Sequence, residues 1–428
     1  MKPGIQNKNT YKSYFDSDIM LNVVVRNPRQ EKRTVNKTIS IKVSLTLLAA
    51  AAVFISLISS GAASAAPQKQ PAAKPAFSII AAHPYLASAS PLVQELDTDR
   101  IKLGITSLGT FGIGNGHVFA LTGIDYPQNM LLNIVGPIYE KEEELQFYNV
   151  SHRIEDSAGS PINLPRTKLY RVSRTSIIVC EERNDSLAML TVTYAPPDAN
   201  TIVRDITVKN TSAAALPAFR IAAIVSGKAG KAEPDGGRLV QHVKDRRMTV
   251  AFAGRQSEAS AGVLALKAGP LAPGAEAHFT LFITPQFENE KYAISIPGAD
   301  AAKPAPALDA TRKWWLKWFV GTLEAESSDP RLAGVFESIL ALIKVQMSAG
   351  SGVASPMGKY SGFWCRDNYG PLRYFLASGH YADARRSLEY FDLATRMNGF
   401  RNRYPLDVDI SKAPAKIDWN KFQPQQGD

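Results

Sequence analysis

Residues 352–369 read GVASPMGKYSGFWCRDNY and separate two parts of the chain that have helical periodicity. On the N-terminal side, apolar residues recur every three or four positions between residues 332 and 347. On the C-terminal side, the same spacing returns at Leu372, Phe375 and Leu376. The pattern predicts a helix, a loop and a second helix, and short connections between helices indicate antiparallel hairpins.

A third helix is predicted directly after the second. Gly379 is a stop signal for the second helix, and Leu388, Phe391 and Ala394 predict a third helix that begins near Tyr381. The apolar face of the first helix is predicted to comprise Leu332, Val335, Phe336, Ile339, Ile343 and Met347.

Trp364, Arg366 and Asp367 stand almost side by side in the predicted loop. Arginine offers a planar fork of donors, and an ionised aspartate offers only acceptors. Neighbouring sugar hydroxyls both donate and accept, and an indole can cover the apolar face of a sugar ring. The three residues therefore fit a carbohydrate-binding site. A local ion pair with Asp367 at a helix N-terminus is the alternative interpretation.

The order of these residues resembles that of a known enzyme family. Val353-Ala354-Ser355-Pro356, a glycine-containing loop and Trp364-Cys365-Arg366-Asp367 are similar to a segment of the glucoamylases, glycoside hydrolase family 15, which are six-hairpin glycosidases. The resemblance extends over residues 310–400, and more weakly over the β-rich region before them. It implies an (α/α)6 barrel that follows a β-sandwich.

The resemblance also implies an activity. Members hydrolyse α-glucosidic bonds at the non-reducing ends of oligo- or polysaccharides with inversion and without a cofactor. Trp364, Arg366 and Asp367 would bind the terminal sugar, with Cys365 at the variable position of the motif. The open alternatives are a trehalase-like or other inverting enzyme on the same fold, and a non-catalytic, exported glycan-binding protein.

Residues 329–428 are expected to hold only the start of such a barrel. Twelve helices with their connections need well over about 150 residues. Inverting enzymes use a general acid and a general base about 6.5–9.5 Å apart. The resemblance implies that both are glutamates from later loops, beyond residue 428, so the chain as given is expected to be inactive. Glu389 lies in a predicted surface helix and is expected to be solvated.

Residues 97–300 are predicted to form an antiparallel β-sandwich. Short runs with period-two alternation are separated by turn residues such as Asn210-Thr211-Ser212 and Pro273-Gly274. The alternating sets include Ala188, Leu190, Val192 and Tyr194; Ile202, Ile206 and Val208; Phe219, Ile221, Ala223 and Val225; Met248, Val250 and Phe252; and Ala277, Phe279, Leu281 and Ile283. The fold class is thus a multidomain β + α arrangement, a sandwich followed by helices.

Two short segments have competing interpretations. Residues 112–116, Gly-Ile-Gly-Asn-Gly, lack the spacing of a dinucleotide fingerprint and favour a tight hairpin. Residues 301–328 are predicted to be an Ala-Pro linker, 301–307, and an aromatic helix. Its residues Trp314, Trp315, Trp318 and Phe319 fit an aromatic cluster between two domains better than a sugar-binding platform.

Residues 1–66 have the layout of an export signal or a membrane anchor. They hold nine Lys or Arg against three Asp or Glu, so six of the ten net positive charges of the chain belong to them. The uncharged apolar run 43–58 is short for a membrane span but could attach the chain to a membrane, and residues 63–65 suit signal cleavage. Residues 67–96 are predicted to be an Ala/Pro-rich tether. We therefore expect an exported protein.

The remaining composition indicates neither a metal nor a nucleic acid. The six histidines have no paired ligand spacing, and outside residues 1–66 the charge is nearly balanced. The two cysteines, Cys180 and Cys365, fall in different predicted domains, so two buried thiols are expected rather than a disulfide.

Overall fold

The computed structural model describes residues 22–23, 39–40, 110–123, 130–136, 149–226, 232–243, 246–254, 257–287, 304–322, 330–350, 352, 363–399, 403–404 and 412–416. The chain divides into two compact units. Met1–Ala66 and Glu324–Ala333 form one unit, of which β1 (Asn22–Val23) and β2 (Ile39–Ser40) are described as an antiparallel pair. Pro67–Leu323 and Gly334–Asp428 form the other, to which the following description applies.

The predicted leader and tether lie almost wholly outside the described residues, and so does the apolar run 43–58. Within the described ranges, no helix is both long enough and apolar enough to cross a membrane.

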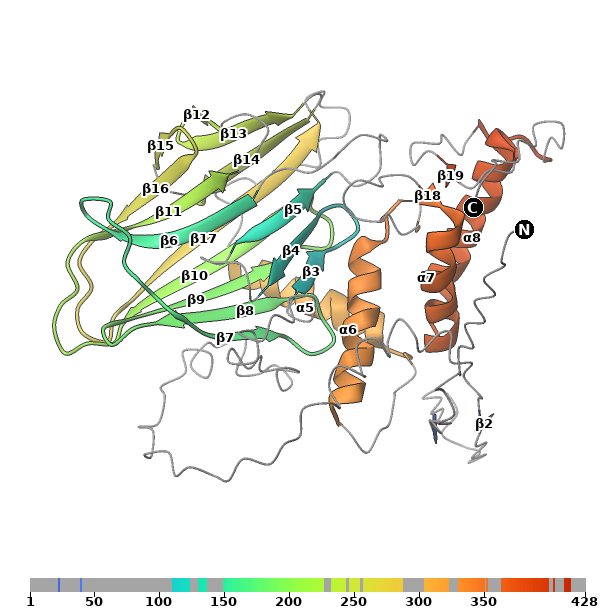
Figure 1. Ribbon diagram of the computed structural model, residues 1–428, viewed down its shortest axis with the longest axis horizontal. Helices are drawn as coiled ribbons and strands as arrows, with labels where there is room; N and C mark the ends of the chain where they lie inside the picture. Colours follow the sequence, from blue (N-terminus) through green and yellow to red (C-terminus); the bar gives the residue numbers. More distant parts are fainter. Residues whose placement is uncertain are drawn as a thin grey trace, which may run out of the picture. The chain divides into compact units, whose positions relative to one another are not determined.

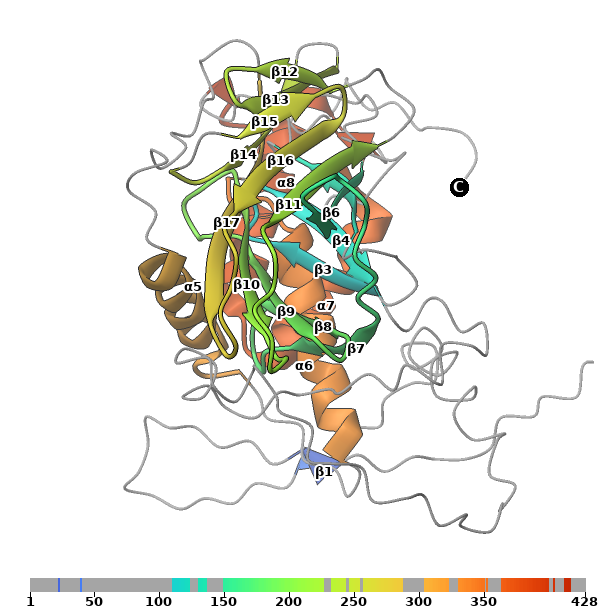
Figure 2. The same cartoon turned by 90° about the vertical axis from the view of Figure 1, so that its left-hand side faces the viewer.

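Two antiparallel sheets confirm the predicted sandwich (Figures 1 and 2). The eight-stranded sheet runs in the order β12 (Glu233–Asp235), β13 (Arg238–Val243), β14 (Arg246–Phe252), β17 (Glu276–Phe287), β10 (Ile202–Asn210), β9 (Leu187–Tyr194), β8 (Ile178–Arg183) and β7 (Arg166–Arg171). The seven-stranded sheet runs in the order β15 (Glu258–Ser260), β16 (Val263–Ala268), β11 (Phe219–Ser226), β6 (Asn149–Asp156), β5 (Leu131–Val135), β4 (Phe119–Gly123) and β3 (Thr110–Gly114).

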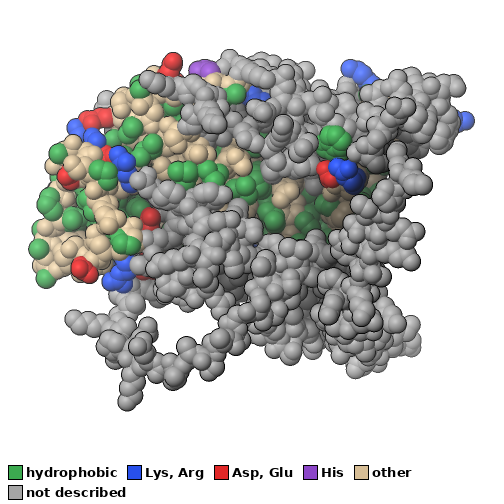
Figure 3. Space-filling view, viewed as in Figure 1, with side chains coloured by type: hydrophobic (Ala, Val, Ile, Leu, Met, Phe, Trp, Pro, Cys, Tyr) green, Lys and Arg blue, Asp and Glu red, His purple; other side chains and the backbone are tan. Residues whose placement is uncertain are grey.

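The main core lies between the two sheets. Alternate residues of the central strands point into it. Their burial removes apolar surface from water, which stabilises the folded state by about 25 cal/mol for each Å² buried. The core includes the predicted sets Ile202, Ile206 and Val208; Phe219, Ile221, Ala223 and Val225; and Met248, Val250 and Phe252. On the described part of the face drawn in Figure 3, acidic and basic side chains are interspersed.

Strand β9 departs from the prediction of one buried face. All eight of its residues are buried. Leu187 and Met189 point into the main core, whereas Leu190, Val192 and Tyr194 pack in a second cluster on the outer face of the sheet. Helix α5 (Pro304–Phe319) covers that outer face with Leu308 and Ala307, which explains the double burial.

Helix α5 begins inside the segment predicted to be a linker. Pro304 is its first residue and Pro306 follows in the first turn, where the backbone N–H groups have no helical acceptor. Prolines at these positions therefore do not oppose the helix. The prediction that residues 301–307 form a linker is wrong from Pro304 onward.

Three further helices follow: α6 (Pro330–Gln346), α7 (Cys365–Ser378) and α8 (Tyr381–Asn398). Gly379 ends α7 with a positive φ of 89°, as its position in the sequence predicted. Phe375 and Ala394 are fully buried, but Leu376 and Leu388 are each 48% exposed, because no described element covers that side of the hairpin. The described helices follow the sandwich in the predicted order, and the barrel itself stays a prediction.

Helix α6 packs on two sides, which corrects its predicted apolar face. Leu340, Ala341 and Val345 are its most buried residues besides neighbouring Met347, whereas Ile339 is only half-buried. These buried residues share one apolar cluster with Phe119 of the sandwich and with residues of the other helices, namely Trp315, Phe319, Phe375, Ala384, Tyr390 and Ala394. Burial therefore spreads around the helix instead of following one stripe. The side chains of residues 332 and 335 lie outside the described set.

The glycine-rich segment 112–116 is a hairpin, as predicted, and its glycines allow α6 to approach. Asn115 closes the turn by donating its N–H to the carbonyl of Val118 at 3.3 Å. A β-carbon at Gly112 would lie 2.8 Å from Leu342, and one at Gly116 would lie 2.7 Å from the carbonyl oxygen of Met347. Gly116 also has a φ of 91°, which favours glycine.

Candidate functional site

The Trp364–Asp367 motif lies at the start of a helix rather than in a loop. Strand β18 (Phe363–Trp364) pairs with β19 (Arg403–Tyr404), which places Trp364 opposite Arg403. Trp364 is the N-cap of α7, with extended backbone angles, and the helix begins at Cys365. The prediction of a loop is therefore wrong for residues 363–369. Residues 363–364 pair with β19 as a strand, and the helix begins about one turn earlier than the apolar spacing indicates.

The motif's two charged residues contact each other. Arg366 Nε lies 3.3 Å from Asp367 Oδ1, and the side chains are 69% and 37% exposed. Trp364 is half-buried next to them. Asp367 lies in the first turn, where the helix dipole favours an acid, but α7 has no side-chain cap hydrogen bond at Trp364. The arrangement presents a donor fork, a carboxylate and an indole within one short stretch of chain.

Helix α7 has a buried side as well as the exposed side that carries Arg366 and Asp367. Asn368 is 2% exposed and donates from Nδ2 to the carbonyl oxygen of Trp364 at 3.0 Å, while Phe375 packs in the helical core. Asn368 thereby joins the N-cap residue to the first turn. Asn368 was not among the predicted site residues, and a polar residue one turn after the cap was the signal available.

The segment between α6 and the motif is fixed by hydrogen bonds where it begins, at Ala349 and Gly352. Ala349 donates its N–H to the carbonyl of Gly116 in the β3–β4 hairpin at 3.0 Å. Gly352 accepts a hydrogen bond from Ser387 of α8, and a β-carbon there would collide with Arg386. Residues 353–362, which include the predicted Ala354-Ser355-Pro356 turn, lie outside the described residues.

The tryptophans of α5 form a packing cluster, as the preferred interpretation predicted. Trp315 is fully buried, and Trp318 stacks on His380 with ring centroids 3.9 Å apart and planes 7° apart. Trp318 also donates from Nε1 to Asp383 at 2.7 Å, and Lys344 pairs with the same carboxylate at 2.8 Å. Because one face of Trp318 is occupied by His380 and Trp315 is buried, these two rings do not form a sugar platform.

The charges in this cluster are consistent with a structural role. Burial alone would raise the pKa of Asp383, but Lys344 and the hydrogen bond from Trp318 hold it below its usual range. Burial lowers the pKa of His380 to about 4, with Lys344 acting in the same direction. At neutral pH the cluster therefore holds one ion pair and a neutral imidazole.

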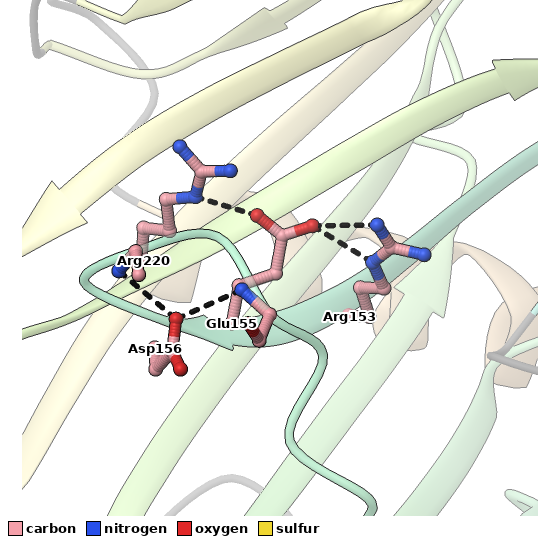
Figure 4. Close-up of polar contacts among 6 residues, drawn as sticks. Arg153, Glu155, Asp156 and Arg220 are labelled. Atoms are coloured by element: carbon pink, nitrogen blue, oxygen red, sulfur yellow. Dashed lines mark hydrogen bonds and ion pairs between the residues drawn. The ribbon is translucent and has the colours of Figure 1, made fainter.

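A second polar cluster lies on the seven-stranded sheet (Figure 4). Glu155 is 1% exposed and binds Arg153 at 2.7 Å and Arg220 at 2.5 Å, while Asp156 accepts the backbone N–H groups of Ala158 and Ser160. The two arginines and two acids sum to zero charge. Each carboxylate has its own partners, so the cluster is a cross-strand ion-pair network that stabilises β6 against β11.

A third polar group lies inside the sandwich. Arg204 Nη1 contacts His152 Nδ1 at 2.8 Å, and His152 Nε2 contacts Thr191 Oγ1 at 2.9 Å. Because arginine can only donate, Nδ1 accepts and Nε2 carries the proton toward Thr191. Burial and the positive charge of Arg204 lower the pKa of His152 well below its usual value. Both ring nitrogens of the buried His152 therefore have hydrogen-bond partners, which is consistent with a structural role.

The acids of helices α6 and α8 are engaged in ion pairs. Glu337 pairs with Arg174, Glu389 with Arg385, and the remaining pairs are Asp383 with Lys344 and Asp392 with Arg396. The side chain of Glu389 is 57% exposed, which matches the expectation of a solvated residue. We therefore assign none of these four as a general acid or base.

The cysteines and the potential metal ligands give no further site among the described residues. Cys180 is buried and Cys365 half-buried, and the two form no disulfide. Burial raises the pKa of the Cys365 thiol to about 11, so it is protonated at neutral pH. Within the part of the chain that the structure describes, no group of three or more His, Cys, Asp or Glu is placed to hold a metal ion.

Comparisons with known proteins give structural similarities only. No family model and no curated protein matches the chain. A candidate kojibiose phosphorylase from the human microbiome is 12% identical, with a TM-score of 0.47, over 71% of this chain and 48% of that protein. A family GH92 α-mannosidase from Bacteroides thetaiotaomicron is 11% identical, with a TM-score of 0.28, over 69% and 48%. A galactose mutarotase related enzyme from Lactobacillus acidophilus is 6% identical, with a TM-score of 0.27, over 43% and 99%. The chain spans about half the length of the first two proteins.

Proposed function

We propose that this chain belongs to a carbohydrate-active enzyme of the glucoamylase type, an inverting glycoside hydrolase that removes sugars from non-reducing ends. The observation that carries the proposal is the exposed Arg366–Asp367 pair beside Trp364, at the start of a helical hairpin that follows a β-sandwich. The sequence resemblance supports the same activity. Export of the protein is part of the proposal, based on residues 1–66.

The three residues have complementary roles in the proposed site. Asp367 offers two carboxylate oxygens to sugar hydroxyls, and Arg366 offers guanidinium donors to hydroxyl oxygens. The ion pair between them aligns both groups before the sugar arrives, which lowers the ordering cost of binding. Trp364 would cover the apolar face of the ring. The general acid and base would be glutamates outside the present sequence, as the resemblance implies.

Calorimetric titration of the chain with maltotriose and with trehalose tests the binding site. Hydrogen bonds to charged groups contribute about 1.5–3 kcal/mol, so Asp367→Ala should weaken binding about ten- to a hundredfold. Asp392→Ala is the matched control, because Asp392 is another exposed acid that pairs with an arginine one turn away. Circular dichroism checks the fold of both variants. Equal affinity of a folded Asp367→Ala variant and the unaltered chain would contradict the proposal.

A further inference from the structure

Helix α7 contains a proline in its interior. The helix has 14 residues, and Pro371 is the seventh of them. Proline is the least favourable residue for a helix interior and glycine the next, so the pair Gly370-Pro371 opposes helix formation at this point. In the first turn proline would be harmless, but α7 begins at Cys365 and Pro371 is therefore well past that turn.

Packing does not explain the glycine beside it. Gly370 is exposed, and nothing lies within 4 Å of where its β-carbon would be. A residue before proline loses the helical conformation through a clash between its β-carbon and the proline ring, and glycine has no β-carbon. Gly370 can therefore keep a helical conformation before Pro371, where a residue with a β-carbon would clash with the proline ring.

Pro371 removes one specific hydrogen bond. In an α-helix the N–H of each residue bonds to the carbonyl oxygen four residues earlier. Pro371 has no N–H, and the residue four positions before it is Asp367. The proline ring is also incompatible with the regular helical position of that carbonyl. The backbone acceptor that loses its helical donor therefore belongs to the aspartate of the proposed sugar site.

The position of this oxygen suits a ligand bound at Asp367. Carbonyl groups of a helix point toward its C-terminus, so the oxygen lies further along the helix than the Asp367 side chain, which leans toward the N-terminus. Gly370 is next to it on the exposed side and has no side chain to cover it. Carboxylate and carbonyl together would offer three acceptor oxygens to neighbouring hydroxyl groups.

We propose that Pro371 keeps the carbonyl oxygen of Asp367 available as an acceptor for a sugar hydroxyl. This inference rests on the proposed function, because it extends the same binding site. It assigns to Asp367 a backbone contact besides its side-chain contacts, and it makes Pro371 a positioning residue. The ligand class is a sugar with two hydroxyl groups, one of which reaches the carboxylate of Asp367 while the other reaches its carbonyl oxygen.

Two substitutions distinguish the effect of the missing N–H group from an effect of helix stability. Pro371→Ala and Pro371→Gly both restore a donor for the Asp367 carbonyl, but alanine favours the helix much more than glycine does. In the full chain, both variants should bind maltotriose about three- to tenfold more weakly, which corresponds to one hydrogen bond. Their melting temperatures should differ, with Pro371→Ala above the unaltered chain. A structural role alone would not raise stability and lower affinity together.

A spectroscopic measurement reports on the oxygen directly. The ¹³C chemical shift of the Asp367 carbonyl should move when the unaltered chain is saturated with maltotriose. In Pro371→Ala it should already be displaced before maltotriose is added, and it should then stay constant.

Asp367→Ala separates failure of this inference from failure of the proposed function. If Asp367→Ala loses affinity while both Pro371 variants keep it, the inference is overturned and the binding site stands. Loss in Pro371→Ala without loss in Pro371→Gly would also overturn it, because both variants restore the donor. If Asp367→Ala binds maltotriose normally, the proposed function fails, and the inference fails with it.

Discussion

Arg171 Nη2 donates a hydrogen bond of 2.7 Å to Ser338 Oγ, which connects the end of strand β7 to helix α6. The same guanidinium donates from Nη1 to the carbonyl of Thr175 at 3.0 Å, and Arg171 is 3% exposed. Beside it, Glu337 accepts from Arg174 at 3.0 Å and from Ser173 at 3.2 Å. The contact between the sandwich and α6 is therefore polar at the end of β7 and apolar at the β3–β4 hairpin.

Ser338→Ala should destabilise the protein by about 1–3 kcal/mol, since it removes an acceptor from a buried guanidinium. Chemical denaturation gives the free energy of unfolding. Ser173→Ala is the control, because its hydroxyl serves the half-buried Glu337 and should cost less than about 1 kcal/mol. Similar losses in both variants would show that burial of Arg171 does not set the energy of this contact.

Gly116→Ala should destabilise the junction between the β3–β4 hairpin and α6. A left-handed φ and a collision with the Met347 carbonyl oxygen together should cost about 2–4 kcal/mol. Gly274→Ala isolates the backbone component, because Gly274 has a φ of 75° with nothing within 4 Å of its β-carbon position. Thermal melts of the two variants should differ, and equal melting temperatures would mean that the close approach is not restrictive.

Lys344→Met should leave the Asp383 carboxylate buried without its cation. The two side chains are 14% and 11% exposed, and breaking such a pair typically costs about 3–5 kcal/mol. Lys313→Ala, which disrupts an exposed pair with Asp309, should cost less than about 1 kcal/mol. The comparison is made by urea denaturation at pH 7. The loss in Lys344→Met should shrink as the pH falls and Asp383 becomes protonated.

Asp205 should make stability depend on pH near neutrality. Burial raises its pKa to about 7, although hydrogen bonds from Thr280 and Tyr194 favour the charged form. A raised pKa in the folded state means that the native protein holds the proton more tightly, so stability falls as the pH rises from about 4 to 7. Asp205→Asn cannot ionise and should therefore gain stability over the unaltered chain as the pH rises.

The gain should reach at most about 4 kcal/mol at pH 8, from the size of the shift. It is measured as the difference in unfolding free energy between the two proteins at pH 5, 6, 7 and 8, which cancels the titration of other groups. Asp185→Asn, at an exposed aspartate, is the control for removing one surface carboxylate. A constant difference between Asp205→Asn and the unaltered chain would contradict a raised pKa.

Several features could be predicted because they depend on local periodicity. Alternation at residues 202–208 and 219–225 predicted strands, since a strand in a half-buried sheet repeats every two residues. Gly379 predicted a helix end, because glycine adopts a positive φ without strain. Trp364, Arg366 and Asp367 could be identified together as a candidate site, because residues so close in the chain cannot lie far apart in space.

Other features could not be predicted, because they depend on partners far away in the sequence. The outer face of β9 is buried only because α5 covers it, more than 100 residues later. The starting point of α7 at Cys365 accompanies the pairing of β18 with β19, which no short-range pattern announces. With a loop predicted up to residue 369, Pro371 would stand at a harmless position near a helix start.

Sequence patterns were enough to predict a β-sandwich followed by a helical hairpin and to single out the candidate sugar-binding residues. Both follow from periodicity and from the chemistry of neighbouring side chains, which are local properties. Two relationships become visible only in the folded chain: the glycines at 112 and 116 make room for α6, and Pro371 lies inside α7, four residues after Asp367. Those relationships depend on which elements pack together and on the residue at which a helix begins, and non-local contacts set both.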